Sequence, residues 1–82
     1  MVTNRANTAP RATQVQVERE QLIVQLADGR QIGIPLAWFP RLQAGTPEQQ
    51  AGWRLMGEGT GIRWDTLDED ISVAGLLGLT PD

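Results

Sequence analysis

Side chains that could carry acid–base or metal chemistry are few in this 82-residue chain, which contains no His, no Cys and no Lys. Their absence excludes thiolate nucleophiles, Schiff-base chemistry and transition-metal sites built on Cys or His. The densest remaining group is acidic: Asp65, Asp68, Glu69 and Asp70. An EF-hand calcium loop needs Gly at its sixth position and Glu at its twelfth. Counted from Asp65, those positions hold Asp70 and Leu76, so we expect no metal, no cofactor and no enzymatic activity.

These acids have a structural interpretation instead. A hydrophobic stretch follows them directly, and carboxylates near the start of a helix stabilise its dipole by up to about 1 kcal/mol each. The sequence therefore predicts an acidic loop at 65–70 that leads into a C-terminal helix over 71–79, with Asp70 or Ser72 as its cap.

A second candidate site is the glycine-rich segment Gly57-Glu58-Gly59-Thr60-Gly61, because glycine-rich loops can cradle phosphates. The segment lacks the Gly-Lys-Ser/Thr ending of a phosphate loop, and no predicted helix follows it. Glu58 would also repel a phosphate. We therefore predict a turn between two strands here.

Three tryptophans, Trp38, Trp53 and Trp64, are many for a chain of this length. Single-strand nucleic-acid binders stack bases on such rings, but they pair them with a basic groove that this sequence lacks. Trp53 and Trp64 alternate with polar residues, so we assign them to the core. Trp38 is expected to be half exposed.

Trp38, Phe39, Pro40 and Arg41 form the predicted partner-binding site, here called the Trp38 corner. Trp and Arg are enriched at interface hot spots, Pro40 stiffens the backbone, and an arginine can bind a carboxylate of a partner in bidentate fashion. We expect the partner surface to combine this corner with an edge of a β-sheet. The competing interpretation is that Trp38 covers one end of the core.

Charge is unevenly distributed along the chain, whose net charge is −3. Six Arg against four acids give residues 1–57 a net charge of +2, and one Arg against six acids gives residues 58–82 a net charge of −5. The acidic third disfavours binding to a phosphate backbone. No signal-peptide hydrophobic region and no apolar run of about 20 residues is present, so we expect a cytoplasmic protein that does not bind a membrane.

Alternating hydrophobicity predicts three antiparallel strands, at 14–18, 21–27 and 30–35. Asp28-Gly29 between the second and third strands predicts a type I′ turn. Before them, residues 1–13 have little to bury and are expected to form a disordered tail. The remaining boundaries are a single domain over 14–79 and a C-terminal tail at 80–82.

Short helices and a further hairpin are expected after the meander. Residues 36–44 predict one or two helical turns broken at Pro40, and Thr46-Pro47-Glu48-Gln49 is typical of a capping box. Residues 53–64 predict a hairpin. The fold class is therefore α+β, two-layer, with a three-stranded antiparallel meander plus a further strand or hairpin and short helices. The expected core consists of Val15, Val17, Leu22, Val24, Leu26, Ile32, Ile34, Leu36, Leu42, Leu55, Ile62, Trp64, Ile71 and Leu76.

Four segments together resemble the bacterial domain-of-unknown-function family 2442 over residues 14–78. They read Leu-Ala-Asp-Gly-Arg at 26–30, Ile-Pro-Leu-Ala-Trp-Phe-Pro-Arg-Leu at 34–42, Gly-Thr-Gly-Ile-Arg-Trp at 59–64 and Leu-Asp-Glu-Asp-Ile-Ser-Val at 67–73. Members of the family often have His where this chain has Arg63 and Pro where it has Asp65, so no role of that His is carried over. The resemblance implies a two-layer α+β fold with a bent antiparallel sheet and no established activity.

The resemblance also implies a setting. Relatives occur alone or ahead of a helix-turn-helix domain, and many are encoded beside another small protein in a toxin–antitoxin-like arrangement. We therefore expect a protein-interaction module, acting as the regulatory or antitoxin-like partner of a small protein encoded nearby. A homo-oligomer stays open, and the alternative function is a nucleic-acid-associated transcriptional regulator that acts through a partner.

Overall fold

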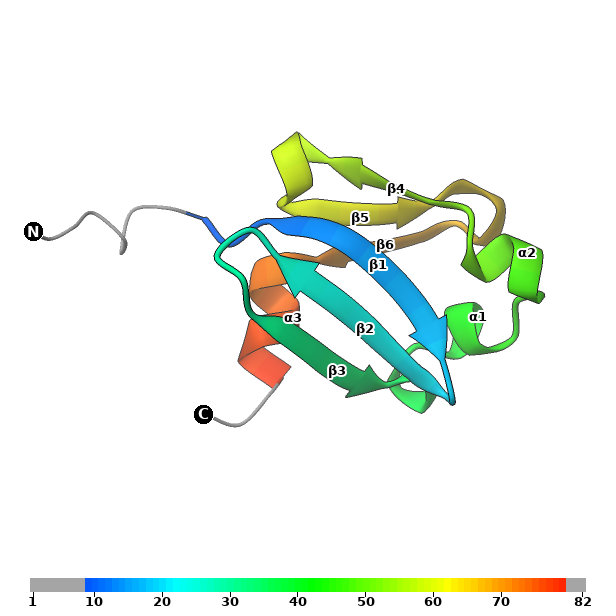
Figure 1. The fold of residues 1–82 in the computed structure, drawn as a ribbon. Coiled ribbons are helices and arrows are strands. Elements are labelled where there is room, and N and C mark those ends of the chain that lie inside the picture. Colours follow the sequence, from blue (N-terminus) through cyan, green and yellow to red (C-terminus); the bar gives the residue numbers. More distant parts are fainter. Residues whose placement is uncertain (1–8, 80–82) are drawn as a thin grey trace, which may run out of the picture.

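Two three-stranded antiparallel sheets and several short helices make up the chain in a computed structural model that describes residues 9–79, with Leu79 as backbone alone (Figure 1). The predicted α+β fold class is confirmed. The predicted tail at 80–82 and residues 1–8 of the other predicted tail lie outside the described residues. The tail prediction is wrong for residues 12 and 13, because Ala12 begins the first strand and is buried.

The first sheet consists of β1 (Ala12–Glu18), β2 (Gln21–Leu26) and β3 (Gln31–Pro35), in that order. The predicted meander is confirmed within two residues at each end. Alternation decides which face is buried: Leu22 and Val24 of β2 are fully buried, and they lie opposite Ile34 and Ile32 of β3. Val17 and Ile32, both expected in the core, are partly exposed where they pack against it.

The turn chemistry differs from the prediction. Left-handed backbone at two successive residues occurs at Arg19 (φ 52°) and Glu20 (φ 65°), in the two-residue turn between β1 and β2. At the predicted type I′ turn, Gly29 has φ 96° and Asp28 does not have a positive φ. The reason is the length of the loop. The Leu26 N–H donates to the Arg30 carbonyl at 2.8 Å, so the loop contains three residues. A three-residue loop favours a type I turn followed by a left-handed glycine.

A helical connection joins the two sheets. Strand β3 ends at Pro35, and a 3₁₀ turn η2 (Leu36–Trp38), helix α1 (Pro40–Gln43) and helix α2 (Pro47–Gln50) follow. The predicted break at Pro40 and the predicted capping box are confirmed. In that box the Gln49 N–H donates to Thr46 Oγ1 at 3.1 Å and the Thr46 N–H donates to Gln49 Oε1 at 2.9 Å.

The second sheet consists of β4 (Trp53–Met56), β5 (Gly61–Trp64) and β6 (Glu69–Ser72), with 3₁₀ turns η3 (Gly57–Gly59) and η4 (Asp65–Leu67) between them. The predicted hairpin around the glycines is confirmed. The acidic loop predicted at 65–70 is wrong for its last two residues, which belong to β6. Its acids disfavour a strand, and pairing overrides them: Ile71 lies opposite Ile62 in the core and Asp70 lies opposite Arg63 on the outer face.

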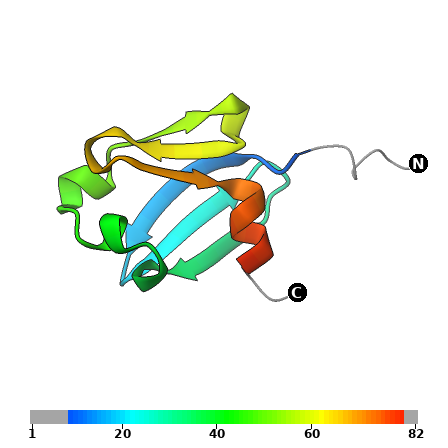
Figure 2. The ribbon, with the colours of Figure 1, turned by 180° about the vertical axis from the view of Figure 1, so that it is seen from behind.

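Helix α3 (Val73–Leu79) begins two residues later than predicted, because Ile71 belongs to β6. Ser72 caps it, since its Oγ accepts from the Gly75 N–H at 3.2 Å. Seen from behind, α3 covers the inner side of the first sheet at one end, and the helical connection lies at the other (Figure 2).

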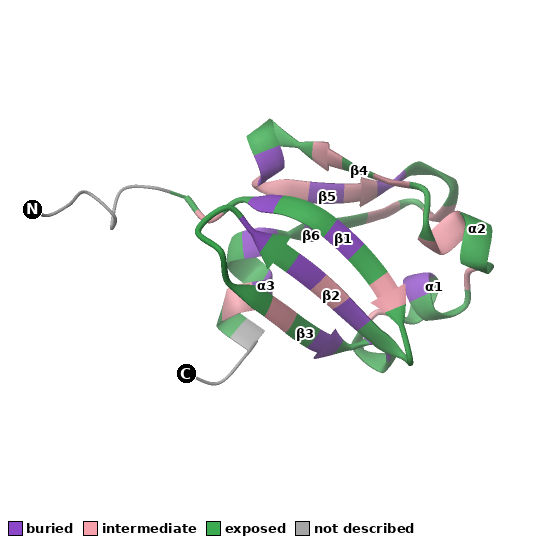
Figure 3. Ribbon diagram, in the orientation of Figure 1, coloured by how far each residue is buried: buried purple, intermediate pink, exposed green. Residues whose placement is uncertain are grey.

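One core unites both sheets and the helices. Its buried members are Ala12, Val15, Leu22, Val24, Leu26, Ile34, Leu36, Leu42, Ile62, Trp64, Ile71, Val73 and Leu76 (Figure 3). Ala12 and Val73 were not expected there, and Leu55 is partly exposed. Among the helices at residues 9–79, none is long and apolar enough to cross a membrane.

The Arg19-Glu20 turn generates a stability prediction. Left-handed backbone costs a residue with a Cβ roughly 1–2 kcal/mol, and glycine avoids most of that cost. Glu20→Gly should therefore raise the free energy of unfolding by about 0.5–1 kcal/mol in urea titrations followed by tryptophan fluorescence. The matched control Glu48→Gly removes the same charge from α2 and should lower it by up to about 1 kcal/mol. Equal effects of the two substitutions would contradict the turn assignment.

Candidate functional site

The Trp38 corner lies where β3 passes into the helical connection. Leu36 is buried and fixes the start of η2, while Trp38, two residues on, is 53% exposed. The Phe39 N–H donates to the Leu36 carbonyl at 2.9 Å, and the Phe39 ring packs against the core. Trp38 is therefore held outward by a backbone that its neighbours anchor, which agrees with the half-exposed position expected from the sequence.

Pro40 and Arg41 complete the corner as the first two residues of α1, and both are exposed. Arg41 is already engaged within the chain. Its Nη1 donates to the backbone carbonyl of Asp68 and lies 3.8 Å from Asp68 Oδ2, while 63% of its side chain stays exposed. The contact ties α1 to the turn before β6, so the corner is braced from the second sheet.

Next to the corner, β3 forms an open edge of the first sheet. Within residues 9–79, β3 pairs with β2 alone. The Leu36 N–H donates to the Glu20 carbonyl and the Leu26 N–H donates to the Arg30 carbonyl. Because inward and outward residues alternate along an antiparallel strand, Ile32 and Ile34 bond to β2. The backbone groups of Gln31, Gly33 and Pro35 point away from β2, in the plane of the sheet, and have no strand beside them. These three residues are here called the β3 edge, and their backbone groups are called outward.

A second cluster, which sequence reasoning missed, covers the outer face of the second sheet. Arg63 lies at its centre and contacts three carboxylates: Asp65 at 3.0 Å, Asp68 at 3.0 Å and Asp70 at 3.4 Å. Arg54, opposite Arg63 on β4, binds Asp65 through two nitrogens, at 2.7 and 3.2 Å. Asp65, Asp68 and Asp70 therefore neutralise arginines rather than stabilise the dipole of α3.

The same contacts shift the pKa of the groups. The hydrogen bond from Arg54, supported by that from Arg63, lowers the pKa of Asp65 below its usual range. Hydrogen bonds to Asp65 raise the pKa of Arg54, and those to Asp68 and Asp65 raise that of Arg63. These shifts stabilise the charged forms of Asp65, Arg54 and Arg63. The cluster could have been predicted from a β-hairpin with its turn near Asp68. Such a hairpin places Arg63 and Asp70 on the same face of the sheet.

The glycine-rich segment at 57–61 has a packing role in the structure. Glu58 lies in η3 with φ 59°, and the nearby Gly59 (φ 96°) packs against β1: a Cβ on it would lie 2.5 Å from the Ala12 carbonyl oxygen. The glycines thus allow a close approach of backbones, as the predicted turn requires. Within residues 9–79, no group of three or more acidic, His or Cys side chains is arranged to hold a metal ion.

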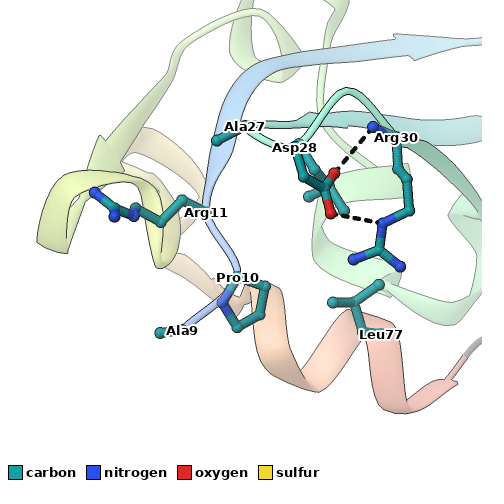
Figure 4. A pocket seen from close by; sticks show the side chains of 8 residues that line it. Ala9, Pro10, Arg11, Ala27, Asp28, Arg30 and Leu77 are labelled. Carbon is teal, nitrogen blue, oxygen red and sulfur yellow. Dashed lines mark hydrogen bonds and ion pairs between the residues drawn. The ribbon is translucent and has the colours of Figure 1, made fainter. Parts of the chain in front are cut away.

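A pocket of about 810 Å³ lies between the start of β1, the β2–β3 turn and α3 (Figure 4). The single carboxylate among its lining residues is Asp28, which accepts from the Arg30 N–H at 3.0 Å and from Arg30 Nε at 2.8 Å. Both contacts hold the Asp28 carboxylate within the β2–β3 turn.

The arginine–aspartate cluster predicts an acid-dependent loss of stability. Because the pKa of Asp65 is lower in the folded chain than in the unfolded one, it contributes stability above about pH 4, and this is lost as the pH falls through its folded pKa. Urea titrations between pH 7 and pH 2.5 should show a shallower acid-side decline for Asp65→Asn than for the wild type. Identical declines would show that Asp65 contributes nothing through its charge.

Comparisons with known proteins agree with this fold. A crystal structure of a protein of unknown function from Rhodospirillum rubrum is similar to this chain with a TM-score of 0.75 and 30% sequence identity, over 87% of this chain and 88% of that one. No curated protein matches. The family model described as "Protein of unknown function (DUF2442)" matches residues 12–81. The chain therefore belongs to the DUF2442 family, as the resemblance in its sequence indicated.

Proposed function

We propose that this chain is a protein-interaction module, with a binding rather than a catalytic role, and that it binds through the Trp38 corner and the adjoining β3 edge. One observation carries the proposal. Trp38 is 53% exposed, the highest value among the exposed large hydrophobic residues at 9–79, and it lies three residues after the end of an edge strand.

The corner has the properties of an interface anchor. A tryptophan buries a large area on binding and is among the residues most enriched at hot spots. The backbone around Trp38 is fixed by buried Leu36 and by Phe39 packed on the core, so binding orders little additional chain. Lower ordering cost leaves more of the contact energy as affinity.

The β3 edge offers the second half of the surface. Unpaired strand groups invite the addition of an extended segment, in which main-chain hydrogen bonds give affinity. The other edge strands are less suited. Each of them carries a charged residue: Glu18 on β1, Arg54 on β4, and Glu69 and Asp70 on β6. Charged side chains protect an edge from pairing. The strand β3 has no charged residue.

Charge pairing favours a protein partner over a nucleic acid. Five of the seven arginines are paired with carboxylates, which reduces the positive surface open to phosphates: Arg11, Arg30, Arg41, Arg54 and Arg63. The alternative, a nucleic-acid-associated regulator, predicts a gel shift at about 50 mM salt, where electrostatic binding is strong; our proposal predicts none for the chain alone.

The partner we propose is a small protein encoded nearby, for which this chain serves as a regulatory or antitoxin-like subunit. The basis for this part of the proposal is the toxin–antitoxin-like gene order that the family resemblance implies. A partner of this kind would contribute an apolar pocket to Trp38.

Binding of the neighbouring gene product tests the proposal. Trp38→Ala should weaken it by at least about 2 kcal/mol, because the substitution removes the anchor, and should change the free energy of unfolding by less than about 1 kcal/mol, because the residue is exposed. The measurements are isothermal titration calorimetry and urea unfolding.

The matched control is Met56→Ala, which removes the other exposed large hydrophobic side chain, 37% exposed on β4. It should leave binding unchanged. A Trp38→Ala variant that unfolds would support the competing interpretation of Trp38 as a core cover. One that folds and binds with wild-type affinity would exclude the corner as the binding site.

A further inference from the structure

The β3 edge is complementary to itself. Its outward residues are Gln31, Gly33 and Pro35, so an antiparallel pairing of two copies can place Gly33 of one copy opposite Gly33 of the other, on a two-fold axis. The two Gly33 residues then exchange both of their backbone hydrogen bonds. Gln31 of each copy lies opposite Pro35 of the other, and its N–H donates to the Pro35 carbonyl.

Pro35 leaves one outward group of the strand unpaired in this register. Proline lacks an N–H, so the Gln31 carbonyl is the one outward group of β3 without a partner. That carbonyl lies at the strand end and is exposed with the rest of its residue, where water can bond to it. A shift that places Gly33 opposite Pro35 makes fewer hydrogen bonds, because the Pro35 nitrogen cannot donate to the Gly33 carbonyl.

Side chains match in the same register. On the inner face, Ile32 of one copy lies opposite Ile34 of the other, which is an apolar pair of β-branched residues, favourable across strands. Ile32 is partly exposed in the single chain, so pairing buries more of it. On the outer face, Gly33 meets Gly33, and a Cβ placed there meets only the Gln21 side chain, at 3.5 Å.

Charge also permits two copies to meet. The outer face of the first sheet is almost uncharged. Its alternating residues are Gln14, Gln16 and Glu18 on β1, Gln21, Ile23 and Gln25 on β2, and Gln31, Gly33 and Pro35 on β3. Like charges directly opposite each other would destabilise the pairing, and β3 brings none.

We infer that a second copy of this chain occupies the β3 edge, forming a two-fold dimer with a continuous six-stranded sheet and two Trp38 corners. The inference deepens the proposed function, since it assigns the β3 half of the proposed binding surface and leaves the Trp38 corners for the other partner. The chain is then a dimeric adaptor, with one corner at each end of the central strand pair.

Sedimentation equilibrium of the full chain over about 1 µM to 1 mM tests the dimer. The wild type should show twice the mass of a single chain at the upper concentrations. Gly33→Pro removes the N–H at the two-fold axis but no hydrogen bond to β2, because that N–H points outward. It should weaken dimerisation at least about tenfold. The matched control Gly33→Ala keeps the N–H and should dimerise as the wild type does.

Gln31→Pro removes the other outward N–H, at the first position of the strand, where proline is tolerated. It serves as the second test variant if circular dichroism shows that Gly33→Pro does not fold. A wild type that stays monomeric at every concentration, or a folded proline variant that dimerises normally, would overturn the inference. Neither result affects the proposed function, which stands or falls on partner binding by Trp38→Ala in calorimetry.

Discussion

Burial of Trp64 is the constraint on which the rest of the structure depends. It is the largest of the fully buried side chains, and its indole N–H donates to the Gln50 carbonyl at 2.9 Å, so a buried polar group is satisfied at the end of α2. This fixes which face of β5 points inward. Arg63, the preceding residue, must then point outward, and there it gathers the acids that hold η4 and β6 in place.

The same residue type has opposite environments in Trp38 and Trp64, and the difference follows from chain direction. Trp64 lies in a strand whose alternation buries it beside Ile62. Trp38 follows Pro35, which ends β3 and turns the chain into a 3₁₀ helix, where Leu36 takes the inward position. One tryptophan therefore lies in the core, and the other lies at the end of an uncharged open edge, which is the observation behind the proposed binding role.

Local patterns were predicted well from the sequence, and features that need tertiary pairing were not. The meander and the Thr46–Gln49 capping box depend on alternation or on contacts three residues apart. Strand β6 has one inward apolar residue, Ile71, and is stabilised by pairing with β5, so no local pattern reveals it. In the candidate site, the sequence predicted a half-exposed Trp38 beside Phe39-Pro40-Arg41, and Trp38 is 53% exposed. Neither the bond of Arg41 to Asp68 nor the choice of β3 as the open edge could be read from spacing.

The central claim is that β3 binds another protein strand, and amide hydrogen exchange of β3 by NMR tests it most directly. Ile32 and Ile34 point toward β2, and their amides should exchange slowly under all conditions. The outward amides of Gln31 and Gly33 should exchange rapidly in dilute chain and become protected when a second copy or a partner is bound. Rapid exchange of both outward amides in every bound state would contradict the claim.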